Sequence, residues 1–334
     1  MLRGPWPRVT ADGVVLAHLE AAVAAGSAPP EELEVALARI LAEAVGAQVA
    51  AGMGLVTDGW VRWADPARAV LAAFKEVDTG PAGLLVRSWR ATMAITDAPV
   101  AQVVPGPWTL SLRDVGGFGD LGVVTGQASA HAATLAGELA ALADAGCSVV
   151  IVDEPGAVGV GANLSAREGF TRSHRRLLRD APDMHAMLAI AGGSAHEVGP
   201  ESIFGVPYSS YLFDLIEGPD NWLLVRAAPE ERGIVCAALR TAPGSLLGDQ
   251  APELVWAAKY AASAHGRGLD RVGLANASSL RDHSPAEAVE ALVALGRAAE
   301  LAALPLADAV RAGLDPRTVR TMPGPASKTP AGGS

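Results

Sequence analysis

Cysteine is nearly absent from this chain of 334 residues, which contains only Cys147 and Cys236. Two cysteines so far apart in sequence form neither a disulfide framework nor a Cys-x-x-Cys metal motif. Because isolated thiols are typical of a reducing compartment, they predict a cytoplasmic protein.

Basic charge and long apolar runs are also scarce. Lysine occurs only as Lys75, Lys259 and Lys328, and the formal net charge is −10, which argues against a nucleic-acid partner. The apolar runs are short and broken by charged residues, so we expect no bilayer span and no membrane partner. Residues 1–10 lack the apolar core of a signal peptide, which argues against secretion.

What the chain does contain is an alternation of helical patterns with short apolar runs. Apolar residues recur at helical spacing in 30–54, 125–146, 253–266 and 285–302. Strands are predicted within 55–58, 98–107, 147–155, 183–193, 221–227, 244–249 and 271–278. The alternation indicates a parallel sheet covered by helices. We expect a closed (β/α)8 TIM barrel over residues 1–320 and a disordered tail over 321–334, with a doubly wound open sheet as the alternative.

Polar residues at the ends of the predicted strands favour the barrel, because a barrel brings these ends together on its catalytic face. They are Asp58, Asp153, Arg226, Asp249 and Ser278.

Two adjacent carboxylates, Asp153 and Glu154, follow the apolar run 149–152. On a continuing strand they point to opposite faces, so one enters the barrel mouth and the other meets the helices. The alternative is that Asp153 caps a following helix or loop while Glu154 pairs with an arginine.

Four motifs occur in the order found in one known family. They are "LRGPWPR" (2–8), "AQVAAGMGLVTDGWVRWADP" (47–66), "QVVPGPWTL" (102–110) and "LADAGCSVVIVDEPGA" (142–157). Over residues 2–300 the chain resembles the C-terminal catalytic barrel of the cobalamin-independent methionine synthase family. The resemblance implies the TIM barrel of the methionine synthase and uroporphyrinogen decarboxylase type, and methyl transfer as the ancestral activity.

The resemblance also implies a zinc site, which this sequence does not preserve. Family members hold zinc with a His-x-Cys pair after the fifth strand, a Glu after the sixth and a Cys after the eighth. The corresponding residues here are Ala189 and Ala191, then Arg226, then Ala277 and Ser278. Alanine has no ligand atom and arginine repels a cation, so we expect no zinc.

The family's substrate residues are partly retained. Asp153 stands at the Asp that contacts the amino acid, whereas Trp60 replaces a substrate-binding acid. The family's folate-stacking Trp would fall near Arg113, and Trp108 on the same loop is a possible substitute, so folate remains a candidate ligand. Arg8, Arg62 and Arg226, together with Trp60, suggest an anionic or planar substrate. Surface ion pairs are the alternative for each arginine, and loop packing is the alternative for Trp60.

Two further features have simple interpretations. His196 follows a strand near the expected mouth and is the best candidate for a general base. The match to Gly-x-Gly-x-x-Gly at 117–122 follows no clean buried strand, so we interpret it as a loop over the mouth and not as a nucleotide site.

Three hypotheses for function remain. The first is a methyl or alkyl transferase that acts without zinc on a small anionic metabolite. The second is a non-catalytic relative that binds a metabolite or serves as a partner subunit, and a homodimer is also possible. The third is different chemistry in the same mouth, with Asp153 or His196 as acid or base.

Overall fold

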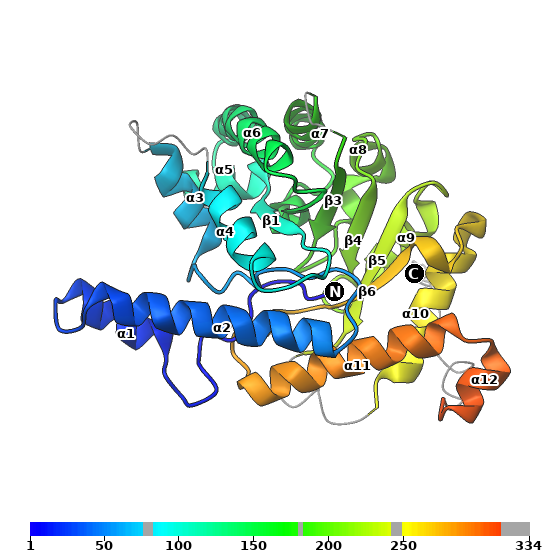
Figure 1. Cartoon of the computed structure of the whole chain (residues 1–334). Helices are drawn as coiled ribbons and strands as arrows, with labels where there is room; N and C mark the ends of the chain where they lie inside the picture. The colour runs from blue at the N-terminus through cyan, green and yellow to red at the C-terminus, as the bar shows by residue number, and fades with distance from the viewer. Residues whose placement is uncertain (76–82, 180–182, 242–248, 315–334) are drawn as a thin grey trace, which may run out of the picture.

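Six parallel strands lie side by side in chain order in the computed structural model, which describes residues 1–75, 83–179, 183–241 and 249–314. They are β1 (Gln102–Pro105), β2 (Val149–Asp153), β3 (His185–Ile190), β4 (Ser210–Asp214), β5 (Gly233–Leu239) and β6 (Val272–Asn276). Figure 1 shows the strands at the centre of the molecule with helices around them.

Two further segments close the sheet into a ring. Val56 pairs in parallel with Val100 beside β1, and its amide N–H donates to the Pro99 carbonyl at 2.9 Å. On the opposite side, the Arg3 amide donates to the Asn276 side chain at the end of β6 at 2.8 Å. The Trp6 amide then donates to the Gly59 carbonyl at 2.8 Å, which links the two segments.

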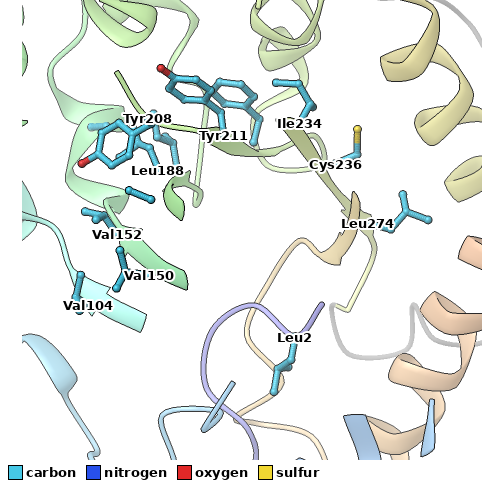
Figure 2. Close-up of a cluster of buried hydrophobic side chains, with 14 of the residues drawn as sticks. Leu2, Val104, Val150, Val152, Leu188, Tyr208, Tyr211, Ile234, Cys236 and Leu274 are labelled. Carbon is cyan, nitrogen blue, oxygen red and sulfur yellow. The ribbon is translucent and has the colours of Figure 1, made fainter. Parts of the chain in front are cut away.

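The six strands and these two segments together fill the eight strand positions, here called staves, of a closed (β/α)8 barrel. The expected fold class is therefore confirmed. Residues 1–6 and 55–58 take the places of the first two strands, and β1 to β6 follow as the third to the eighth. Figure 2 draws Leu2, on the N-terminal segment, with Leu274 on β6 to one side and Val104 on β1 to the other.

Helices surround the barrel on its outer side. They are α1 (Leu16–Ala24), α2 (Pro30–Ala50), α3 (Pro66–Lys75), α4 (Leu84–Met93), α5 (Pro107–Val115), α6 (Leu121–Asp144), α7 (Leu164–Leu178), α8 (Pro200–Phe204), α9 (Trp222–Ala227), α10 (Ala251–Ser263), α11 (Pro285–Ala303) and α12 (Leu306–Arg311). In Figure 1, α2 and α11 lie side by side. A Cβ at Gly296 would overlap the Ala51 carbonyl, so this contact requires glycine. In the part of the chain that the structure describes, no helix is long and apolar enough to cross a bilayer.

Alternating strand residues build two layers of core. The outward-facing residues, such as Val104, Val152 and Leu188, pack beneath the helices (Figure 2). The inward-facing residues are mostly small and fill the barrel together with one indole. This inner cluster consists of Trp60, Ala101, Val103, Ile151, Met187, Ala189, Leu212, Val235, Ala237 and Ala275.

Most predicted elements are confirmed, with three differences. The strand expected over 221–227 is wrong, because these residues form α9, and a short apolar run fits either kind of element. The sequence analysis also missed β4 and β5. The strand expected over 244–249 and the tail over 321–334 fall almost entirely outside the described residues.

Candidate functional site

A pocket of about 980 Å³ opens at the end of the barrel where the strands finish. Its wall comes from segments that follow several staves, as the mouth of a (β/α)8 barrel does. The polar side chains in this wall are Asp65, Thr109, Arg113, Ser279, Arg281 and Asp282. Of the residues that the sequence analysis proposed for the site, none lines this pocket, although Asp153 and Ser278 are adjacent in sequence to the mouth segments.

Two arginines supply the positive charge of the pocket wall. Arg113 forms an ion pair with Asp65. Arg281 donates to the backbone carbonyls of Ala64 and Trp63. It forms no ion pair with a carboxylate of the described residues, although the charges of Asp282 and Asp65 act on it. Its Nε–H is buried without a hydrogen-bond partner. Burial, and secondarily the nearby charge of Arg8, lowers the pKa of Arg281.

Asp153 lies at the end of β2 and faces the interior of the barrel. It follows Ile151 of the inner cluster by two residues, and therefore points to the same side of the strand. Burial raises the pKa of the Asp153 carboxyl, the Arg3 guanidinium opposes that shift, and Glu154 adds to it. A carboxyl with a raised pKa is suited to proton transfer near neutral pH.

Arg3 is a mouth residue that the sequence analysis missed. Its guanidinium donates to the Ala277 carbonyl after β6, and its Nε–H is buried without a partner. Asn276 fixes the backbone of Arg3 from both sides, by accepting from its N–H at 2.8 Å and donating to its carbonyl at 2.6 Å. The one available signal was the position of Arg3 inside the first motif, "LRGPWPR".

Glu154 points away from the mouth, toward the helices, and is completely buried. Its carboxylate accepts the backbone N–H of Trp108 at 3.0 Å and of Thr109 at 2.6 Å, and also the Thr109 hydroxyl. These are the first amides of α5, so Glu154 caps that helix and meets the positive end of its dipole. The two carboxylates therefore have different environments, as alternation along a strand requires.

His174 on α7 completes the surroundings of Glu154. Its Nε2 lies 3.0 Å from a Glu154 oxygen, without the angle of a hydrogen bond, and its Nδ1 lies 2.7 Å from the Tyr208 hydroxyl. All three side chains are fully buried. The alternative pairing of Glu154 with an arginine is therefore wrong, because the buried partner is a histidine.

Trp60 occupies the barrel interior. It is only 6% exposed, belongs to the inner cluster, and has a φ of +52°, which is unfavourable for a residue other than glycine. Asp58 holds the turn, because its carboxylate accepts the Trp60 N–H at 2.9 Å and the Ser88 hydroxyl at 2.7 Å. The indole thus fills space at the mouth end of the barrel.

Three other predicted residues lie apart from the pocket. Arg8 donates to the Val61 carbonyl at 3.0 Å and forms an ion pair with Glu20, so its charge is compensated within the fold. Arg62 pairs with Glu34 on α2. Trp108 is fully buried in the outer core against Phe170, so its ring is not free to stack on a folate.

The remaining predicted residues lie on a helix, before a helix, or after a strand. Arg226 is exposed near the end of α9 and not at a strand end, which corrects its predicted place. Asp249 is exposed and accepts the Ala251 N–H at the start of α10. Ser278 follows β6 and is half-buried, with its carbonyl accepting from Asn276. His196 lies after β3, and its Nδ1 is buried without a partner.

The donor set of this mouth does not fit a zinc ion. Ala189 and Ala191, at the end of the fifth stave, carry no ligand atom. The residue at the end of the sixth stave is Asp214 and not Arg226, because β4 is the sixth stave. The Asp214 carboxylate already accepts three backbone N–H groups, from Gly192, Ile216 and Glu217. Among the described residues, no group of three His, Cys, Asp or Glu side chains is placed to hold a metal.

Comparison with known proteins identifies structural relatives. No family model and no curated protein sequence matches this chain. A B12-independent methionine synthase from Shewanella sp. W3-18-1, solved in complex with selenomethionine, aligns with a TM-score of 0.71 and 14% identity, over 93% of this chain and 98% of that one. A putative vitamin-B12 independent methionine synthase from Listeria monocytogenes gives 0.66 and 16%, over 90% and 96%.

A methyltransferase from Methanosarcina mazei is a third similar structure. It aligns with a TM-score of 0.53 and 16% identity, over 88% of this chain and 93% of that one. At such identities the likeness shows a common fold, which extends over nearly the whole length of each relative.

Proposed function

We propose that this protein is a divergent relative of the cobalamin-independent methionine synthases that transfers a methyl or alkyl group to a small anionic metabolite without zinc. The observation that carries the proposal is an inward-facing carboxyl of raised pKa, Asp153, at the end of β2, with the charge of Arg3 acting on it. The pocket at the same end of the barrel is lined by Arg113 and Arg281. The similarity of the fold to methionine synthases and a methyltransferase supports the reaction class.

The proposed chemistry needs a proton acceptor and no metal. The nucleophile is an amine or an enol, which needs no thiolate formation. Its lone pair forms the new bond to the alkyl carbon while the bond between that carbon and the donor breaks. Asp153 takes the proton that the nucleophile releases, and the donor's leaving group takes up a proton, so charge and protons balance.

Binding of an anion is proposed for the arginines of the mouth. Arg281 is the strongest candidate, because its Nε–H is buried and unpartnered and no carboxylate of the described residues forms an ion pair with it, while Asp282 and Asp65 act on its charge from nearby. A guanidinium binds a carboxylate or phosphate with directed, charge-assisted hydrogen bonds. Arg113, which stands where the family's folate-stacking Trp would fall, presents a planar group to the same pocket. Folate therefore remains a candidate alkyl donor.

One observation favours a second candidate, a metabolite-binding relative without catalysis. The indole of Trp60 fills interior space where the family has a substrate-binding acid, and Arg8, Thr109 and Glu154 of the retained motifs have structural partners. Under this alternative the protein binds an anion or assembles with a partner subunit. The size of the assembly is measurable by light scattering.

A binding screen followed by a transfer assay separates the two candidates. Thermal stability is measured with phosphate esters and small carboxylates, first for the wild type, then for Arg281→Gln and for Arg90→Gln, an exposed control on α4. We expect stabilisation that is lost only in Arg281→Gln. Stabilisation that persists in Arg281→Gln would contradict the anion site.

Ligands found in this screen are then tested with methyl-labelled 5-methyltetrahydrofolate as the alkyl donor. Transfer that falls at least about 100-fold in Asp153→Asn, with binding retained, supports an enzyme with this base. Binding without transfer in the wild type, and unchanged by Asp153→Asn, supports the non-catalytic relative.

A further inference from the structure

A second pocket, of about 480 Å³, opens at the opposite end of the barrel, where the strands begin. Its wall includes the starts of β3, β4, β5 and β6, the segment before Val56, and one side of α11. The N-terminal end of a TIM barrel usually serves stability, and catalytic groups lie at the other end. A pocket here is therefore a candidate for binding and not for the alkyl transfer proposed above.

Glycine residues in its wall leave this pocket open, because glycine has no side chain. Gly54, Gly233 and Gly273 all line the pocket. At Gly233 an added Cβ would lie 2.9 Å from the Ser210 Cβ, so the side chain of Ser210 requires glycine beside it. A volume of this size is within the range of small-molecule sites.

The polar anchor of the pocket is one hydrogen-bonded pair, His185 and Ser210. Met187 and Leu212 belong to the inner cluster, so His185 and Ser210, two residues before them, also face the interior. The His185 Nε2 lies 2.7 Å from the Ser210 hydroxyl oxygen. His185 is exposed at the start of β3, and partial desolvation of its ring lowers the pKa of the imidazole, which favours the neutral form.

The rest of the inner wall suits an aromatic ring. Met53 and Met187 line the pocket and are 8% and 5% exposed. Thioethers are polarisable and make favourable contacts with aromatic rings. The charged side chains of the wall, Asp270 and Arg271, are one acid and one base that follow each other in the chain. Met1 also lines the pocket, where its α-amino group donates to the Leu274 carbonyl at 2.6 Å and burial lowers its pKa to about 5.

We infer that this pocket binds an uncharged aromatic molecule with one hydrogen-bonding group, held between the His185–Ser210 pair and the methionines. This inference does not depend on the proposed function, because the pocket lies at the other end of the barrel. The ligand adds no charge to a site whose polar pair is neutral, and its polar group exchanges hydrogen bonds with Ser210 or His185.

The test uses N-phenyl-1-naphthylamine, an uncharged aromatic amine whose fluorescence rises in apolar sites. We expect saturable binding with one site per chain. Gly54→Trp should weaken binding at least about 10-fold by obstructing the pocket, since Gly54 lines it and a Cβ there meets no other atom within 4 Å. Ser210→Ala should weaken it about 3- to 10-fold. Gly46→Trp, on the exposed face of α2, is the matched control and should bind like the wild type.

A measurement on the unaltered protein covers the case in which a variant misfolds. Bound probe should slow peroxide oxidation of Met53 and Met187, read by mass spectrometry, and leave the exposed Met93 unaffected. Absence of saturable binding would overturn the inference. Binding that survives Gly54→Trp and protects neither Met53 nor Met187 would overturn it as well, because the probe would then occupy another surface.

Discussion

The Thr109 amide N–H donates to the Glu154 carboxylate at 2.6 Å, across 45 residues of sequence. This bond joins the motif that contains Gly106 and Thr109 to the motif that contains Glu154. A Cβ at Gly106 would overlap the Glu154 carboxylate, and the Gly156 N–H donates back to the Thr109 hydroxyl at 2.9 Å. The two motifs are halves of one buried structural unit. Their presence in the sequence therefore indicates the fold and does not indicate the reaction.

Removing the carboxylate of this unit should destabilise the protein. Glu154→Ala leaves the Trp108 and Thr109 amides of α5 without their acceptor and removes the carboxylate that lies 3.0 Å from the His174 ring. We expect the free energy of unfolding to fall by about 3–5 kcal/mol, measured by urea denaturation. Glu168→Ala, an exposed position on α7, is the control and should change it by less than about 0.5 kcal/mol. A small effect of Glu154→Ala would show that water replaces the carboxylate.

Removing the indole from the barrel should open a cavity that accepts a ligand. Trp60→Ala should lower the free energy of unfolding by about 3–5 kcal/mol, because a large buried side chain is lost. Free indole should then raise the melting temperature of the variant and leave that of the wild type unchanged. If indole stabilises both proteins equally, Trp60 does not fill the space assigned to it.

A buried carboxyl beside Trp60 should make stability depend on pH. Burial raises the pKa of Asp58 above its ordinary value of 3.8, although bonds from Trp60 and Ser88 oppose the shift. The folded state therefore binds the proton more tightly than the unfolded state. The resulting stabilisation is complete below the unfolded pKa and is lost as pH rises through the folded pKa.

The matched variant for this pH effect is Asp58→Asn, which keeps an acceptor for the Trp60 N–H and does not titrate. The stability of the wild type relative to this variant should fall as pH rises above about 4. Urea denaturation at several pH values measures the difference. A difference that is constant with pH would mean that Asp58 titrates alike in the folded and unfolded chains.

Zinc should neither copurify with the protein nor stabilise it. Elemental analysis after mild chelation should find well below one zinc per chain, and added zinc should leave the melting temperature unchanged, because Ala189 and Ala191 offer no ligand and the Asp214 carboxylate already accepts three backbone N–H groups. About one zinc per chain, retained after chelation, would return thiol alkylation to consideration.

The sequence predicted the barrel, from the alternation of helices and strands together with the resemblance to a known family, and it predicted the opposite orientations of Asp153 and Glu154. Periodicity indicates helix or strand locally, and alternation of the two leaves few topologies. The sequence was insufficient where a short apolar run fits both a helix and a strand, as at α9. Because α9 was predicted as a strand, Arg226 was placed at a strand end and Asp214, at the end of β4, was overlooked.

Only the tertiary structure decided which polar residues share the mouth. Arg8 and Trp108 look functional in sequence, yet each has structural partners that belong to distant segments. Arg3 and Arg281 lie near opposite ends of the chain, and ring closure beside β6 brings both to the mouth. Local sequence encodes the direction of a side chain along a strand or helix, but its partners depend on how the staves close, which is a property of the whole chain.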